Sequence, residues 1–204
     1  ESRKRVNEKL FQNIKEVRET LVDINKSHSL NDNEANSLIL RLIFIRYLID
    51  REIKIDADYI SGKSTKERRI SFSSLIKNPD KLNQLFSKLN DNFNGALFKE
   101  LDIQISREQS EYLANVFKGE IEEQGSLFEG YYFEIFDFSI IPVEVISGIY
   151  ESLIDPETRD LDSAVYTPSF LVNYILKDTV DKYLEENNTS ECKIFEVAVG
   201  SGIF

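Results

Sequence analysis

Apolar residues recur every three or four positions through the first part of the chain, which is the spacing of one helical face. The inward residues of the first predicted helix are Val6, Leu10, Ile14, Val17, Leu21 and Ile24. A second helix is predicted to begin after Asn31, because Asn31 and Glu34 have the spacing of a capping box. Its inward residues are Ala35, Leu38, Ile39, Leu42, Ile45 and Ile49, and its residues expected to face water are Arg41, Arg46, Asp50 and Arg51. The second helix is apolar on several sides, so we expect it at the centre of a bundle.

The middle of the chain alternates between polar connections and shorter amphipathic stretches. Residues 55–70 are predicted as a polar connection with short strands, and residues 80–89 as a helix. The Asn- and Gly-rich residues 90–95 are typical of a turn, and residues 106–117 predict another helix. The aromatic run at residues 131–138 can pack in a core or stack on nucleic-acid bases, and core packing is favoured.

Two prolines mark helix starts in the last third of the chain. Pro142 is suited to the first position of a helix through Ile154, because proline lacks the N–H group that is unpaired there. Thr167 and Pro168 are suited to the N-cap and first position of a helix carrying Leu171, Tyr174, Ile175 and Tyr183. Residues 187–190 are predicted as a loop.

The last residues predict a buried strand, Lys193–Val199, that runs into a Gly200-Ser201-Gly202 turn. A strand that ends in an acidic residue and a glycine turn is how a Rossmann-like sheet begins a nucleotide or S-adenosylmethionine pocket. The glycines let the backbone approach a ligand closely, and Glu196 is placed to pair with an ammonium group. We therefore expect a helical N-terminal domain over residues 1–140. Residues 141–204 are expected to form a linker helix and the truncated start of an α/β domain.

Composition narrows the possible partners. The 204 residues carry a net charge of −11, which argues against an autonomous DNA clamp, since phosphate contacts require a basic surface. Charge interrupts every apolar stretch before it is long enough to span a membrane, and no secretory signal is visible. The single Cys192 excludes an internal disulfide and fits a reducing cytoplasm.

Other chemical signals in the sequence are weak. Residues 57–64 satisfy a relaxed phosphate-loop pattern, but Asp58 would repel phosphate, and Tyr59 and Ile60 are too bulky for converging N–H groups. His28 is the only histidine and is expected in solvent, and no His/Cys cluster has metal-ligand spacing.

Tyr166-Thr-Pro168, an amphipathic helix and then Ile194-Phe-Glu-Val-Ala-Val-Gly-Ser-Gly202 together resemble the adenine-N6 DNA methyltransferases of restriction-modification systems. The resemblance extends more loosely to residues 141–151 and to residues 40–51 and 86–98, which are similar to parts of fused restriction–methylation enzymes. Val197 and Val199 stand where the family usually has Pro and Cys, and Glu196 stands where it usually has Asp. The family's catalytic tetrapeptide (Asn or Asp, Pro, Pro, aromatic) does not occur among the 204 residues.

The resemblance implies a mainly α fold followed by the truncated start of a Rossmann-like domain that binds S-adenosylmethionine. The parent enzyme would methylate the N6 amino group of an extruded adenine in double-stranded DNA, with a possible endonuclease or specificity component, in the cytoplasm. The fragment alone is expected to be inactive, with no catalytic residue and no metal site. The implied cofactor-binding residues are Tyr166, Thr167, Pro168, Glu196, Ala198, Gly200, Ser201 and Gly202.

Two other classes stay open. Val197–Gly202 also fits the opening of a nicotinamide-dinucleotide site in an oxidoreductase, which requires a third glycine and a later acidic residue. Alternatively, the chain is a non-catalytic helical interaction module in which the glycine turn only connects structure.

Overall fold

The computed structural model describes residues 2–23, 29–93, 97–99, 103–118, 133–142, 145–146, 148–149, 153 and 169–195. The chain divides into two compact units, residues 1–140 and 141–204. The described residues are helices, turns and loops, with no strand among them, so this part of the fold is mainly helical. The helical part of the predicted fold class is therefore confirmed.

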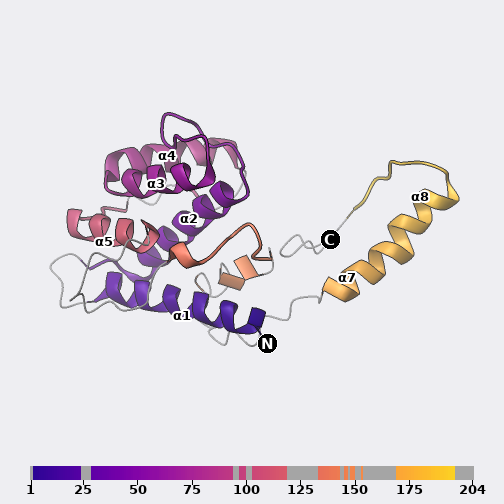
Figure 1. The fold of residues 1–204 in the computed structure, drawn as a ribbon, viewed down its shortest axis with the longest axis horizontal. Coiled ribbons are helices and arrows are strands. Elements are labelled where there is room, and N and C mark those ends of the chain that lie inside the picture. Colours follow the sequence, from indigo (N-terminus) through magenta and orange to yellow (C-terminus); the bar gives the residue numbers. More distant parts are fainter. Residues whose placement is uncertain are drawn as a thin grey trace. The chain divides into compact units, whose positions relative to one another are not determined.

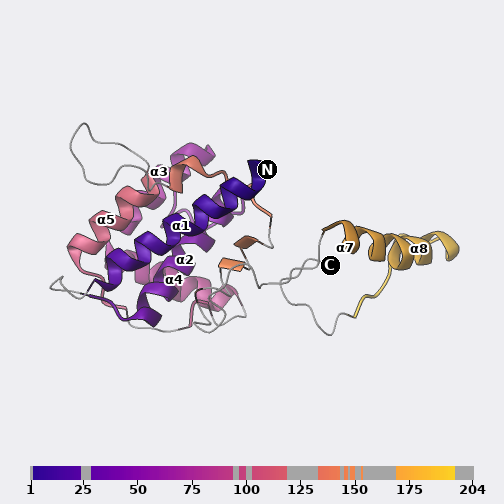
Figure 2. The ribbon, with the colours of Figure 1, turned by 90° about the horizontal axis from the view of Figure 1, so that it is seen from below.

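Unit 1 is a bundle of five described helices and one short 3-10 helix. Helices α2 and α5 lie between α1 on one side and α3 and α4 on the other (Figure 1), and α1 is nearest to the viewer from below (Figure 2). The elements are α1 (Ser2–Val22), α2 (Asp32–Asp50), α3 (Thr65–Ile76), α4 (Pro79–Asn92), α5 (Arg107–Lys118) and η1 (Phe133–Ile135).

Helix α2 is the central element of unit 1. The predicted capping box is present: the Asn31 side chain accepts a hydrogen bond from the Glu34 N–H at 3.0 Å, and the Glu34 carboxylate accepts one from the Asn31 N–H at 2.9 Å. The six predicted inward residues of α2 are all buried. On α1, Leu10, Ile14, Val17 and Leu21 are buried as predicted, whereas Val6 is exposed and Ile24 lies outside the described residues.

An aromatic cluster joins α3, α5 and the segment from Phe133 to Phe138. The Phe117 ring lies edge-on to Phe72, with centroids 5.5 Å apart, and 4.9 Å from Phe133. Phe136 and Phe138 are also buried, so core packing is confirmed for the described part of the aromatic run. Edge-to-face aromatic pairs stabilise a core beyond their burial, so this cluster holds the end of unit 1 against the bundle.

The structure corrects two boundaries in the middle of the chain. Residues 55–70 contain no strand, and α3 begins at Thr65 behind the N-cap Ser64, whose hydroxyl accepts from the Glu67 N–H at 3.2 Å. Helix α4 is confirmed but continues to Asn92, so the predicted turn begins later than expected. The N-cap Ser64 sets the start of α3 at Thr65 in polar sequence, five residues before Ile70, its first large apolar residue after the cap.

Gly62 occupies a backbone conformation that only glycine adopts easily, with φ of +135°. A Cβ added there would lie 2.7 Å from the Glu67 Cβ and 2.9 Å from the Arg68 backbone nitrogen. We expect Gly62→Ala to lower the free energy of unfolding by about 2 kcal/mol, measured by chemical denaturation. The neighbouring exposed change Lys63→Ala serves as control, with an expected loss of less than about 0.5 kcal/mol. Equal losses in the two variants would contradict the strain at Gly62.

Unit 2 is described mainly by one continuous helix, shown at the end of the colour scale in Figure 1. It consists of α7 (Ser169–Leu176), the π-helical turn η3 (Lys177–Asp181) and α8 (Lys182–Glu186). This confirms the predicted helix after Pro168. The helix ends at Glu186, and Asn188 in the turn that follows has a φ of +45°, a conformation that asparagine tolerates. Helical residues at 145–146, 148–149 and 153 agree with the helix predicted over 142–154. Among the helices described, none has the length and apolar character needed to cross a bilayer.

Candidate functional site

The predicted cofactor-binding residues flank the helix of unit 2. Tyr166, Thr167 and Pro168 lie outside the described residues, as do Glu196, Ala198, Gly200, Ser201 and Gly202. What the structure describes is the connection between these two groups. Helix α7 starts at Ser169, directly after Pro168, and the chain continues through α8 to Phe195, directly before Glu196.

The described part of the predicted terminal strand, Lys193–Phe195, is not a strand. A strand is formed by its backbone hydrogen bonds to a neighbouring strand, and no described residue supplies that partner. The side chains of Ile194 and Phe195 are accordingly exposed, Phe195 to 89%. The remaining residues of the predicted strand lie outside the described part of the chain.

A groove of about 780 Å³ lies between η3, α8 and the segment that follows them. Its lining combines the hydroxyl groups of Thr179 and Tyr183 with the free thiol of Cys192. Thr179 Oγ1 donates to the Ile175 carbonyl oxygen at 2.6 Å, so this hydroxyl is used inside the helix. A π-helical turn is rare and is found disproportionately at functional sites, which makes this groove a candidate within unit 2.

Helix α7 also presents aromatic side chains to solvent. Phe170 and Tyr174 are one turn apart on the same face and are 75% and 67% exposed. Val172 of the same helix is buried. Large apolar side chains exposed together on one helix face mark a surface that normally contacts another part of a protein.

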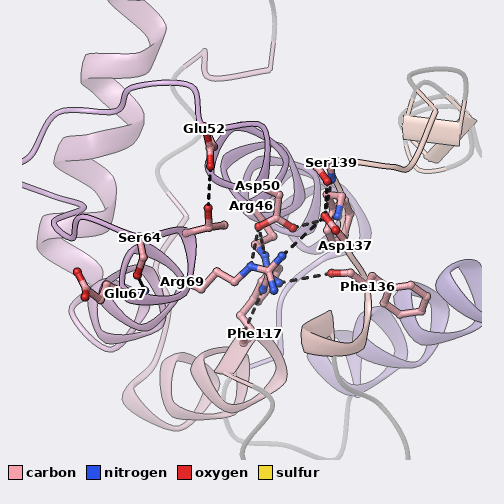
Figure 3. Close-up of polar contacts among 12 residues, drawn as sticks. Arg46, Asp50, Glu52, Ser64, Glu67, Arg69, Phe117, Phe136, Asp137 and Ser139 are labelled. Carbon is pink, nitrogen blue, oxygen red and sulfur yellow. Dashed lines mark hydrogen bonds and ion pairs between the residues drawn. The ribbon is translucent and has the colours of Figure 1, made fainter.

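A buried charge cluster in unit 1 is the most constrained polar arrangement among the described residues (Figure 3). Asp50 Oδ1 accepts hydrogen bonds from Arg46 Nε at 2.9 Å and from Arg69 Nε at 2.8 Å. Its other oxygen, Oδ2, accepts from the Phe138 backbone N–H at 3.0 Å. One carboxylate therefore joins α2, α3 and the Phe133–Phe138 segment.

Arg46 extends this cluster to α5. Its guanidinium group makes long contacts to the carbonyl oxygens of Phe117 at 3.4 Å and Phe136 at 3.5 Å, and lies over the Phe138 ring. Arg69 also lies 4.0 Å from Asp137, a half-exposed carboxylate. Hydrogen bonds from the Ser139 hydroxyl and backbone, together with nearby Arg69 and Arg46, hold the pKa of Asp137 below its usual value.

The expected exposure of three charged residues on α2 is wrong. Arg46 is 0% exposed, and Arg41 and Asp50 are also buried, while Arg51 faces solvent as predicted. Arg41 donates to the carbonyl oxygens of Leu97 at 2.9 Å and Lys99 at 2.6 Å, and burial lowers its pKa. The error arises because apolar spacing assigns charge to solvent, whereas a central helix has neighbours on every side. Arg46 and Asp50 are four residues apart on an apolar helix, and this spacing could have indicated a buried ion pair.

The phosphate-loop-like segment at residues 57–64 has its polar groups engaged internally. The Lys63 N–H donates to Glu67 Oε2 at 2.7 Å, and the Asp58 N–H donates to Asp56 Oδ1 at 2.9 Å. A carboxylate of the protein therefore already stands where an anion would bind at the start of α3, which supports the rejection of nucleotide binding here.

The described residues give little support for metal or thiol chemistry. No group of three His, Cys, Asp or Glu side chains among the residues placed here is arranged to hold a metal ion. Cys192 is a free, half-buried thiol, and His28 lies outside the described residues.

No family model, curated protein or solved structure matches this chain.

Proposed function

We propose that the chain belongs to a DNA adenine-N6 methyltransferase of a restriction-modification or related defence system. The observation that carries the proposal is the helix of unit 2. It begins directly after Pro168 and leads to the segment that precedes Glu196, so a helix connects the two sequence motifs as the resemblance requires. A Tyr-Thr-Pro segment followed by a strand and a Gly-Ser-Gly turn is the part of the sequence with the most specific resemblance.

The exposed aromatic residues of α7 support an α/β domain in this region. Helices of such domains bury an apolar face against a sheet, and Phe170 and Tyr174 form a face of that kind. In this proposal residues 193–199 would pair as the first strand of a Rossmann-like sheet only in the whole enzyme, since residues 193–195 are not a strand here and no described residue offers a neighbouring strand.

The cofactor is S-adenosylmethionine, which would supply the methyl group for the adenine amino nitrogen. Tyr166-Thr-Pro168 and Ala198 would line its site, and the Gly200-Ser-Gly202 turn would let the backbone approach it closely. Glu196 would accept a hydrogen bond from the ammonium group of the cofactor. Because the catalytic tetrapeptide is not among the 204 residues, we expect no methyl transfer by these residues alone.

In this proposal the helical unit 1 connects or orients the catalytic domain. The chain has a net charge of −11, and α2 uses its buried arginines inside the bundle rather than on a surface. Neither property suits a surface that grips phosphates. DNA would then be held by other parts of the enzyme, and double-stranded DNA remains a partner of the whole protein.

The test begins with the coding sequence that follows codon 204 and with the protein that includes it. We expect an Asn-Pro-Pro-aromatic tetrapeptide there, saturable binding of labelled S-adenosylmethionine and transfer of label to N6-methyladenine in duplex DNA. Glu196→Ala should weaken cofactor binding by about 10-fold to about 150-fold, because a charge-assisted hydrogen bond contributes about 1.5 to 3 kcal/mol.

Glu186→Ala is the matched control, because Glu186 ends α8 and is exposed. It should leave cofactor affinity unchanged. Binding of a nicotinamide dinucleotide in place of S-adenosylmethionine, or no binding of either, would refute the proposal.

A further inference from the structure

Unit 1 contains a partly open pocket of about 270 Å³ between the end of α2, the segment after it and the second half of α4. Three buried leucines, Leu48, Leu85 and Leu89, form its apolar floor. A closed apolar cavity of about 150 Å³ holds benzene, so a single aromatic ring fits this open pocket by volume.

An aromatic wall of the pocket is held in place. Phe93 lines the mouth and is 38% exposed. Its ring lies edge-on to Phe44, with centroids 5.5 Å apart and an interplanar angle of 89°, and it also contacts the Phe98 ring at 6.4 Å. A partly exposed aromatic ring fixed by two others gives a ligand a preformed surface on which to pack.

Two of the charges at the mouth neutralise each other. Lys88 donates a hydrogen bond to Asp56 Oδ2 and lies over the Tyr59 ring, 5.7 Å from its centroid. The hydrogen bond from Lys88 lowers the pKa of Asp56, and the Asp58 N–H contributes in the same direction. The hydrogen bond to Asp56 raises the pKa of Lys88 and nearby Asp58 acts in the same direction, so Lys88 is engaged by acidic neighbours and is not free for a ligand.

Lys54 is the remaining cation. It lines the pocket and is exposed, and among the described residues no hydrogen bond or ion pair uses its ammonium group. Asn92 also lines the pocket and is the last residue of α4, where the final carbonyl groups of a helix carry partial negative charge. An anionic group is therefore favoured beside Lys54 and disfavoured beside Asn92.

We propose that this pocket binds a small amphiphilic anion, with an apolar body the size of one aromatic ring on the leucine floor and its anionic group beside Lys54. The site is independent of the methyltransferase motifs, since all of its residues belong to unit 1. The helical unit would therefore bind a ligand separately from the cofactor site.

The test measures binding of 3-phenylpropionate to the 204-residue chain by NMR titration. Two probes share its ring and differ in charge: 3-phenylpropan-1-ol and 3-phenylpropylammonium. We expect saturable binding of the acid with a Kd on the order of 1 mM, weaker binding of the alcohol and the weakest binding of the ammonium probe. The methyl signals of Leu48, Leu85 and Leu89 should shift.

Substitutions distinguish the contribution of the Lys54 charge to binding from that of the buried leucines. Lys54→Ala should weaken binding of the acid about threefold, as expected for one exposed ion pair, and leave binding of the alcohol unchanged. Lys77→Ala is the control, because Lys77 is an exposed lysine that precedes α4, about 20 Å along the helix from Asn92 and outside the lining of the pocket. Leu89→Phe should fill the pocket and abolish binding of both probes, with folding checked by circular dichroism.

Three results would overturn the proposal: no saturable binding of the acid, equal affinity for the three probes, or signal shifts outside the pocket. Lys54→Ala keeps the test decisive if Leu89→Phe does not fold, because an exposed lysine does not support the core.

Discussion

Asp50→Ala is expected to lower the free energy of unfolding by about 3 to 5 kcal/mol. The substitution removes the carboxylate that both Arg46 and Arg69 contact, and it removes the acceptor of the Phe138 N–H. Arg46 is fully buried, so its charge would stay in a low-dielectric environment without this carboxylate. Chemical denaturation measures the loss. Hydrogen exchange at the Phe138 amide should become faster, and this change measures the local loss of stability around that amide.

Asp137→Ala is the matched control for a carboxylate near Arg69. Asp137 is half-exposed and 4.0 Å from Arg69, so its loss should cost less than about 1 kcal/mol. Because the pKa of Asp137 is lowered in the folded protein, its contribution is present above the ordinary pKa of about 4 and is lost as the pH falls.

A double substitution tests the origin of the Asp50 effect. Arg46→Met with Asp50→Leu replaces the buried pair by apolar groups of similar volume and should recover a large part of the loss. A loss for Asp50→Ala no larger than for Asp137→Ala would show that the cluster does not hold unit 1 together.

Phe117→Ala is expected to cost about 3 to 5 kcal/mol, because it removes the ring at the centre of the aromatic cluster. The Phe117 ring is buried between Phe72 and Phe133, and its loss leaves a cavity where three segments meet. Its backbone carbonyl, which Arg46 contacts, stays in place, so the measurement isolates the side chain. Denaturant unfolding monitored by far-UV circular dichroism gives the value.

Phe117→Leu should cost about 1 to 2 kcal/mol, since most of the volume is retained. Phe170→Ala removes the same ring from an exposed position on α7 and should change stability by less than about 0.5 kcal/mol. Similar losses for Phe117→Ala and Phe170→Ala would contradict the assignment of the cluster as core.

The central helix was predictable because two independent signals agree on it. The capping box of Asn31 and Glu34 marks its start, and its apolar residues outnumber the positions of one face. Its buried charges were not predictable from spacing, because their partners come from elsewhere in the chain. Asp50 binds Arg69 from α3 and the backbone at Phe138, contacts that only tertiary structure creates.

Helix α3 was missed although its start signal is in the sequence. Ser64 and Glu67 have capping-box spacing, but the first turn of α3 is polar and lacks a helical apolar pattern. The pocket beside Lys54 could not be predicted either, because its walls come from residues 48–56 and 85–93, which are far apart in the sequence. The assignment of the cofactor-binding residues rests on the sequence alone, since these residues lie outside the described part of the chain.

Glu67 has a consequence for the way this protein can change during evolution. Its carboxylate accepts the Lys63 N–H at the start of α3, in a segment that otherwise resembles a phosphate loop. A protein that supplies its own anion at a helix start excludes foreign anions there. A neutral residue at this one position would remove that internal competitor. The acidic residue at position 67 therefore keeps other anions from the Lys63 N–H as well as supporting the start of α3.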